Sequence, residues 1–116
     1  MASTPRFLQG VFAFRGNGLD KPEIIADSLA YVVPPGVVAQ PLYLRGGNSS
    51  GELIVVTLLR DGVPMRLFPI GARGSVNVPL RVVEDVDPDS RLELTVAAPA
   101  GTTGDVVVDF GLVEVL

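Results

Sequence analysis

Histidine, cysteine and tryptophan are all absent from this 116-residue chain, and lysine occurs only once. Without histidine and cysteine, neither a Ser-His-Asp nor a Cys-His catalytic arrangement can form. The same absences exclude a disulfide framework and a thiolate zinc site. A carboxylate pair is still available in principle, and Glu93 and Asp109 could form one only if the fold brings them together. We therefore predict that the protein is not an enzyme and uses no cofactor.

Clustered positive charge is also missing. Nine basic residues, scattered singly, face thirteen acidic ones, which gives a net charge of -4. Nucleic-acid binding depends on clustered cations, so we expect no nucleic-acid partner. No apolar run approaches the roughly 18 residues of a membrane-spanning helix, and residues 1–6 lead into no signal-peptide core. We expect a soluble chain, cytoplasmic at synthesis, with no membrane partner.

What the chain does contain is hydrophobic side chains, which make up 47% of it. They occur in short runs separated by clusters of Gly, Pro, Asp, Asn and Ser, a pattern typical of strands and turns. The pattern predicts one all-β domain over residues 1–116: an antiparallel β-sandwich of about eight strands, jelly-roll-like. An immunoglobulin-like strand order stays open, because strand order is not visible in a sequence. The predicted strands are residues 7–14, 24–33, 37–44, 52–60, 63–70, 75–83, 91–97 and 106–116. A short helical turn within residues 21–30 is the one alternative to strand.

Two of the predicted strands are apolar on both faces. In residues 52–60, Ile54, Val56 and Leu58 line one face, while Leu53, Val55 and Leu59 line the other. Only one face of a strand meets the core of a two-layer sandwich, so the second face needs cover. The last strand repeats this more mildly, and we expect it to be paired centrally in its sheet. Tyr43 is expected at a surface or interface. The predicted interface residues are Leu53, Val55, Leu59, Tyr43, Val113 and Val115.

The acidic segment 84–90 is the strongest motif-like feature of the chain. Asp85, Asp87 and Asp89 occupy alternate positions, as oxygen ligands do in the first half of a calcium loop. Ser90 stands where the helix-loop-helix calcium motif needs glycine, and Val96 stands where it needs a bidentate glutamate. We interpret the segment as a solvated connection between strands and keep the three aspartates as weak calcium candidates.

The C-terminal residues Asp109-Phe-Gly-Leu-Val-Glu-Val-Leu116 resemble the closing strand of trimeric jelly-roll folds such as the tumour-necrosis-factor family. The resemblance spans about eight residues and implies that a homotrimer is worth testing. Surplus apolar faces usually mark interfaces. The resulting hypothesis is a structural protein that self-associates or docks on a larger assembly. Its expected setting is a virion, as a phage capsid decoration (cement) or tail protein. The alternatives are a small-ligand or carbohydrate-binding module and a calcium-dependent adhesion domain.

Overall fold

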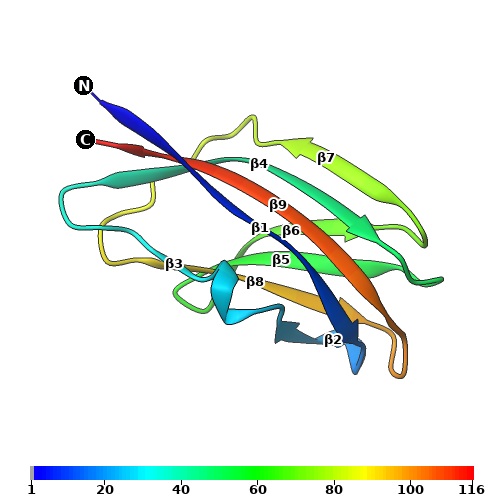
Figure 1. The fold of residues 1–116 in the computed structure, drawn as a ribbon. Coiled ribbons are helices and arrows are strands. Elements are labelled where there is room, and N and C mark those ends of the chain that lie inside the picture. Colours follow the sequence, from blue (N-terminus) through cyan, green and yellow to red (C-terminus); the bar gives the residue numbers. More distant parts are fainter. Residues whose placement is uncertain (1) are drawn as a thin grey trace.

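The computed structural model describes residues 2–116 and contains two antiparallel sheets packed face to face (Figure 1). Sheet A has the order β1-β9-β4-β7, and sheet B has the order β2-β8-β5-β6 with β3 added beside β8. The antiparallel β-sandwich predicted from the sequence is thus confirmed. The strands are β1 (Ser3–Arg15), β2 (Gly18–Ile24), β3 (Tyr31–Val32), β4 (Val38–Asn48), β5 (Ile54–Arg60), β6 (Val63–Ile70), β7 (Ser75–Pro79), β8 (Arg91–Ala98) and β9 (Thr103–Val115).

The core lies between the two sheets and is built by alternation along each strand. Ile54, Val56 and Leu58 of β5 are fully buried, and they meet inward-facing side chains of sheet A such as Leu44 and Phe110. Because successive side chains of a strand point to opposite faces, this burial fixes the outward direction of every intervening residue. The core therefore determines what each sheet presents on its outer face.

The predicted strand 24–33 is wrong as one element. The structure divides it among β2, a 3₁₀ turn η1 (Asp27–Leu29) and β3. The amides of Leu29 and Ala30 donate to the carbonyls of Ala26 and Asp27, at 3.1 and 3.0 Å. This turn carries Leu29 into the core, where it is fully buried. Burying Leu29 in the core therefore interrupts the strand pairing at this point. The helix considered for residues 21–30 is present only as this three-residue turn.

Other predicted boundaries also move, and the strand predicted over 7–14 begins four residues earlier, at Ser3. The strand predicted over 75–83 ends at Pro79, which pairs with Tyr43 of β4. One further bond follows, from the Leu80 amide to the Leu42 carbonyl at 2.7 Å. The strand predicted over 37–44 continues to Asn48, since Gly46 and Gly47 pair with both β7 and β9. Glycines that look like turn residues in the sequence are strand residues in the fold.

The apolar C-terminal strand is central in its sheet, as expected. β9 pairs with β1 from Ser3↔Val115 to Arg15↔Thr103 on one side and with β4 on the other. The two ends of the chain consequently lie side by side (Figure 1). The one helical segment among residues 2–116 is three residues long, so no described helix could cross a membrane.

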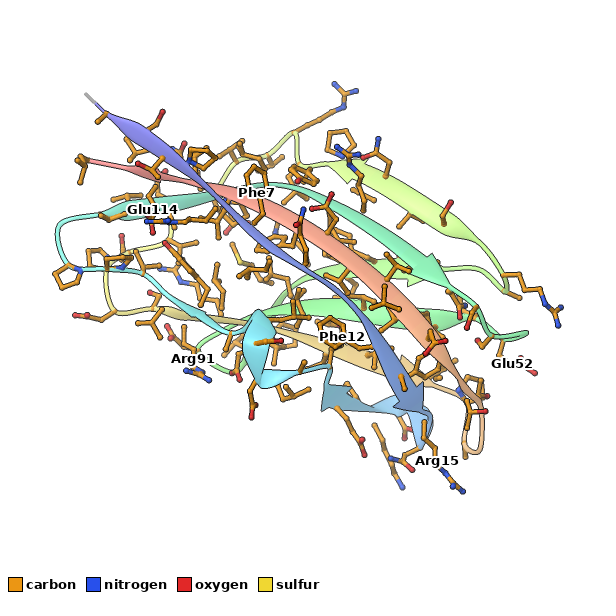
Figure 2. All side chains as sticks on the ribbon, viewed as in Figure 1. Phe7, Phe12, Arg15, Glu52, Arg91 and Glu114 are labelled. Atoms are coloured by element: carbon orange, nitrogen blue, oxygen red, sulfur yellow. The ribbon has the colours of Figure 1, made fainter. Side chains whose placement is uncertain are left out.

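A buried carboxylate links the two sheets near the chain ends. Glu114 of β9, labelled in Figure 2, lies near the chain ends. It accepts hydrogen bonds from Arg6 Nε at 3.1 Å and from the Tyr31 hydroxyl of β3. Burial of the Tyr31 hydroxyl is the main cause, and its hydrogen bond to Glu114 the second, of a Tyr31 pKa well above its ordinary value. Tyr31 therefore packs against the core with a satisfied hydroxyl, as its apolar-face position indicates.

Candidate functional sites on the two outer faces

The outer face of sheet B carries an apolar groove of about 520 Å³. Its floor comes from the central strands β5 and β8, and its walls come from the edge strands β2 and β6. This volume lies in the range of about 300–1,000 Å³ that ligand pockets usually occupy. The sheet B groove is lined by Leu19, Asp20, Pro22, Ile24, Val55, Thr57, Leu59, Gly62, Pro64, Leu67, Thr95 and Ala97.

The floor of the sheet B groove contains two threonines on adjacent strands. Thr57 of β5 lies directly opposite Thr95 of β8. Thr95 is only 4% exposed, and its Oγ1 has no hydrogen-bond partner within residues 2–116. A buried hydroxyl without a partner costs about 1–3 kcal/mol of stability. The structure thus contains an unmet hydrogen-bonding group at the bottom of an apolar groove.

The walls of the sheet B groove are apolar and open to solvent. Leu67 of β6 is 64% exposed, and Leu19 and Ile24 of β2 are also exposed. Asp20, on the wall formed by β2, is the only charged residue in the lining. Ligand pockets commonly have apolar walls around a few polar groups. In such pockets, burial of the ligand's apolar surface gives affinity and the polar groups fix the ligand's orientation.

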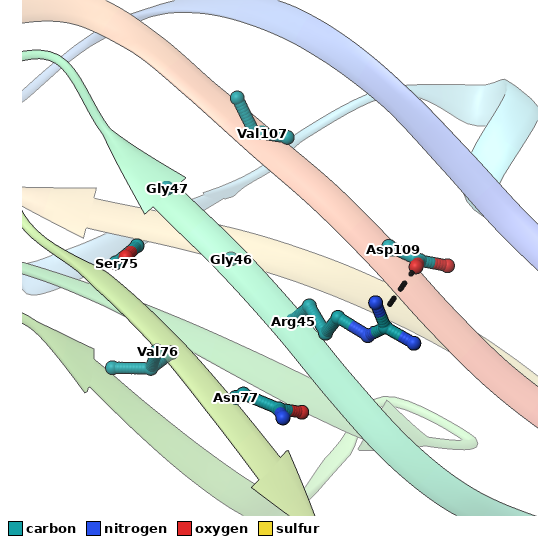
Figure 3. Close-up of a pocket in the computed structure, with 8 residues that line it drawn as sticks. All are labelled: Arg45, Gly46, Gly47, Ser75, Val76, Asn77, Val107 and Asp109. Atoms are coloured by element: carbon teal, nitrogen blue, oxygen red, sulfur yellow. Dashed lines mark ion pairs between the residues drawn. The ribbon is translucent and has the colours of Figure 1, made fainter.

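The outer face of sheet A is organised differently, around Asp109 of β9. Its carboxylate accepts hydrogen bonds from Gln9 Nε2 at 2.9 Å and from the Tyr43 hydroxyl at 3.0 Å. Arg45 Nε lies 3.8 Å from the same carboxylate (Figure 3). The Arg45 guanidinium also lies over the Tyr43 ring. Desolvation and the hydrogen bond to Asp109 raise the pKa of Tyr43. The polar groups of this face satisfy one another across three strands.

Glycines shape the surface beside Asp109. A Cβ at Gly111 would lie 2.0 Å from Cε2 of Tyr43, so the tyrosine ring rests directly on the glycine backbone. A Cβ at Gly47 would meet Val107 at an ordinary 3.4 Å. Between β9 and β7 this leaves an open trough of about 770 Å³ (Figure 3). The sheet A trough is lined by Arg45, Gly46, Gly47, Ser75, Val76, Asn77, Val107 and Asp109.

The predicted interface residues are divided between these two faces. Val55 and Leu59 line the sheet B groove, while Leu53 lies just before β5, outside the groove lining, and is 42% exposed. Tyr43, Val113 and Val115 alternate with buried core residues of sheet A and so lie on its outer face. The fold thus does not bring the six residues together, and an interface at either group stays a prediction.

The acidic segment has a structural arrangement of its own. Asp85 accepts a hydrogen bond from Gln40 Nε2, and Asp87 forms an ion pair with Arg60. Asp89 adopts a left-handed backbone with φ of 69°. In the part of the chain that the structure describes, no three acidic side chains gather into a group that could hold a metal ion.

The carboxylate pair Glu93 and Asp109 does not form. Glu93 alternates with the buried Leu92 and Leu94 of β8 and so faces outward from sheet B, where it pairs with Arg91. Asp109 faces outward from sheet A. The two carboxylates lie on opposite faces of the sandwich, which is no geometry for joint acid-base catalysis.

Sequence reasoning did not identify the other half of the sheet B groove. Leu19, Ile24, Leu67 and Thr95 come from strands whose order cannot be read from the chain. The available signal was the threonine in an otherwise apolar run of β8, Leu94-Thr95-Val96, which matches Thr57 in β5. Their pairing depends on β5 and β8 being neighbours, which only the topology provides.

No protein-family model and no curated protein sequence matches the chain. Among solved structures it is similar to the CBM36-1 domain of a multidomain xylanase from the hindgut metagenome of Trinervitermes trinervoides. That likeness has a TM-score of 0.58 at 15% identity and covers 95% of this chain and 96% of the other. A CBM36 carbohydrate-binding module in complex with calcium and xylotriose gives 0.52 at 18% identity, covering 93% and 97%.

The chain is also similar in fold to part of a virus protein. A chain of infectious bursal disease virus, Gt strain, matches with a TM-score of 0.50 at 12% identity, over 97% of this chain and 32% of the viral one. At these identities the likenesses establish the sandwich fold. The same architecture occurs in a carbohydrate-binding module and in a virus particle.

Proposed function

We propose that this chain is a non-catalytic structural module that self-associates or docks on a larger assembly through the sheet B groove. The setting we propose is a virion, as a phage capsid decoration (cement) or tail protein. The observation that carries the proposal is the groove floor, where the buried Thr95 hydroxyl has no partner in the described chain. The fold likeness to a virus chain supports the proposed setting.

The chemistry of the groove defines what its occupant must offer. Exposed side chains such as Leu67 are stabilised by apolar cover, at about 25 cal/mol for each Å² removed from water. The Thr95 hydroxyl can accept or donate, but it is shielded from solvent, so an occupant that supplies one hydrogen-bonding group removes its penalty only if side chains of the floor move to open it to the groove. An extended protein segment offers both, with side chains for the walls and backbone groups for the hydroxyl.

The test is the assembly mass of the wild type and of a groove variant by light scattering at micromolar concentration. Val55→Asp places a charge on the groove floor, and we expect it to reduce the mass without preventing folding. Val63→Asp is the matched control, because Val63 is 64% exposed on β6 and lies outside the groove lining. A mass of three chains would agree with the trimer that the C-terminal resemblance implies. If Val55→Asp leaves the mass unchanged, the groove is not the assembly surface.

A second candidate function belongs to the sheet A trough, where Arg45, Asn77 and Asp109 offer donors and acceptors beside an open surface. Such groups suit the hydroxyls of a carbohydrate, and the fold likeness to carbohydrate-binding modules favours testing one. Xylotriose is the probe. Binding there should shift the side-chain amide resonance of Asn77, and Asn77→Ala should weaken it. An unchanged spectrum at millimolar sugar removes this candidate.

A further inference from the structure

The outermost strand of sheet A has a long unpaired edge. β1 is 13 residues long and pairs with β9 on one side only. Two backbone hydrogen bonds continue the β1–β9 ladder just beyond the strand ends. The Gly16 amide donates to the Thr102 carbonyl at 2.7 Å, and the Leu116 amide donates to the Ala2 carbonyl at 3.1 Å. Both bonds use even-numbered residues on the β1 side. Since hydrogen bonding alternates along an antiparallel pair, the odd-numbered residues point their backbone groups away from β9.

The free side of β1 therefore presents the N–H and C=O groups of Phe7, Gln9, Val11 and Ala13. Among residues 2–116, no backbone group beyond the ladder with β9 pairs with any of these four. The side chains of the same residues lie on the outer face, where Phe7 is 56% exposed and Val11 is 66% exposed. Phe7 is labelled in Figure 2. Free backbone groups and exposed apolar side chains occur together on one strand.

The other sheet edges carry proline within or at the end of the strand, whereas the central and C-terminal part of β1 does not. Proline cannot donate to a neighbouring strand, so it protects an edge from pairing with another chain. β2 contains Pro22, β6 contains Pro64 and Pro69, and β7 ends at Pro79. β1 has proline only at position 5, and the run from Phe7 to Phe14 contains neither proline nor a charged residue. Residues 7–14 therefore leave backbone groups available for pairing with another strand, while Pro5 removes one donor nearer the N-terminus.

We propose that β1 pairs antiparallel with β1 of a second copy, joining two four-stranded sheets into one sheet across a twofold axis at Gln9. Residue 9 is the midpoint of Ser3–Arg15, so this register spans the strand, and only the pair of Pro5 with Ala13 lacks one of its two hydrogen bonds. It places Phe7 of each copy opposite Val11 of the other, an aromatic and β-branched pair of the kind that stabilises sheets. A register that places Arg6 of one copy opposite Arg15 of the other would pair even-numbered with odd-numbered residues. Only the odd-numbered residues direct their backbone groups to the free edge, so the hydrogen bonds of that register could not form.

The occupant is a second copy because the strand is complementary to itself. A twofold contact repeats each pair, so one register gives the Phe7–Val11 contact twice and brings no like charges opposite each other. This inference extends the proposed function by naming a contact between copies. It uses a different surface from the sheet B groove, so the two can fail separately.

A single introduced cysteine tests the axis, since the chain has none of its own. Residues opposite each other in a hydrogen-bonded antiparallel pair have Cα atoms about 5.5 Å apart, within the range that a disulfide spans. Gln9→Cys should therefore form a covalent dimer on mild oxidation. Asn77→Cys is the control, because it is exposed on the same outer face but lies on the opposite edge strand. Equal dimer yields from the two variants would overturn the proposal.

A proline variant tests the hydrogen bonds themselves. Val11→Pro removes a donor on the free side and leaves the bonds to β9, so we expect light scattering to report loss of the contact in a folded chain. If this variant does not fold, Val11→Lys replaces it, with Val107→Lys as control on the adjacent strand of the same face. Val107→Lys should keep the wild-type mass. A mass unchanged by either Val11 variant contradicts the pairing.

Combining the variants separates this inference from the proposed function. If both surfaces operate, Val55→Asp and Val11→Pro each reduce the mass in part, and the double variant is monomeric. A reduction by Val55→Asp alone supports the groove and overturns the strand pairing. A reduction by Val11→Pro alone supports the strand pairing and overturns assembly through the groove. A wild-type protein that is monomeric at micromolar concentration overturns self-association at both surfaces.

Discussion

The two outer faces of the sandwich differ in whether residues of the chain itself pair their polar groups and cover their apolar surface. On sheet A, Asp109 gathers Gln9, Tyr43 and Arg45, and the Tyr43 ring covers the backbone at Gly111. On sheet B, apolar walls stand open and the Thr95 hydroxyl is buried without a partner. Both faces belong to one fold with one core, so the fold alone does not single out either face as a binding surface. The face whose groups are left unsatisfied is the better candidate for a partner.

The largest effect is expected from displacing the Tyr43 ring that covers Gly111 on the outer face of sheet A. Gly111→Ala would place a methyl group 2.0 Å from the Tyr43 ring, which must then move and release Asp109. We expect a loss of about 2–3 kcal/mol, the upper part of the range for overpacking. For a chain of this size that is a fall in Tm of about 10 °C, measured by circular dichroism.

Gly47→Ala is the control for this substitution. It adds the same methyl group to the same face, where the nearest atoms of Val107 lie at 3.4 Å. Its Tm should stay within a few degrees of the wild type. If both variants lose the same stability, the tyrosine on Gly111 is not the reason.

An intermediate effect of opposite sign is expected on sheet B. Thr95→Val keeps the shape of the side chain and removes the unpaired hydroxyl, so it should stabilise the isolated chain by about 1–2 kcal/mol. Thr57→Val is the matched control on the same floor, because its hydroxyl is not among the unpaired buried groups. If Thr95→Val destabilises the monomer under thermal unfolding, its hydroxyl already has a partner, such as bound water, and the argument from the groove floor fails.

The smallest expected effect removes the charge at the centre of sheet A. Asp109→Asn should cost less than about 1 kcal/mol, because exposed ion pairs contribute little. It should also bring the pKa of Tyr43 back toward its ordinary value of 10.0. With two tyrosines and no tryptophan, phenolate absorbance follows both groups.

The direction of the pH dependence follows from the raised pKa values. As pH rises through about 10, tyrosine ionises in the unfolded chain before it does in the folded one, so the wild type loses stability there. In Asp109→Asn the Tyr43 part of this loss should shrink, while the part from Tyr31 beside Glu114 stays. An unchanged alkaline titration would show that Asp109 does not influence Tyr43.

Alternation within a strand could be read from the sequence, and contacts between strands could not. The two apolar faces of β5 are visible in its residues, and the structure directs Ile54 to the core and Val55 to the outer face. The same reading joined Val55 with Tyr43 as one interface set, although they lie on different sheets. Local patterning reports which side chains share a face of their own strand, but not which strands share a sheet.

The sequence by itself determined that this chain forms a β-sandwich, because its apolar residues alternate over strand-length runs and its turns are punctuated by glycine, proline and aspartate. It also determined that histidine and cysteine chemistry is absent. Only the tertiary structure decided that Thr57 and Thr95 meet on a groove floor, that Tyr43 rests on Gly111, and that β1 forms a free edge. These features depend on which strands are neighbours, and neighbours such as β1 and β9 are brought together from opposite ends of the chain by burial of a common core.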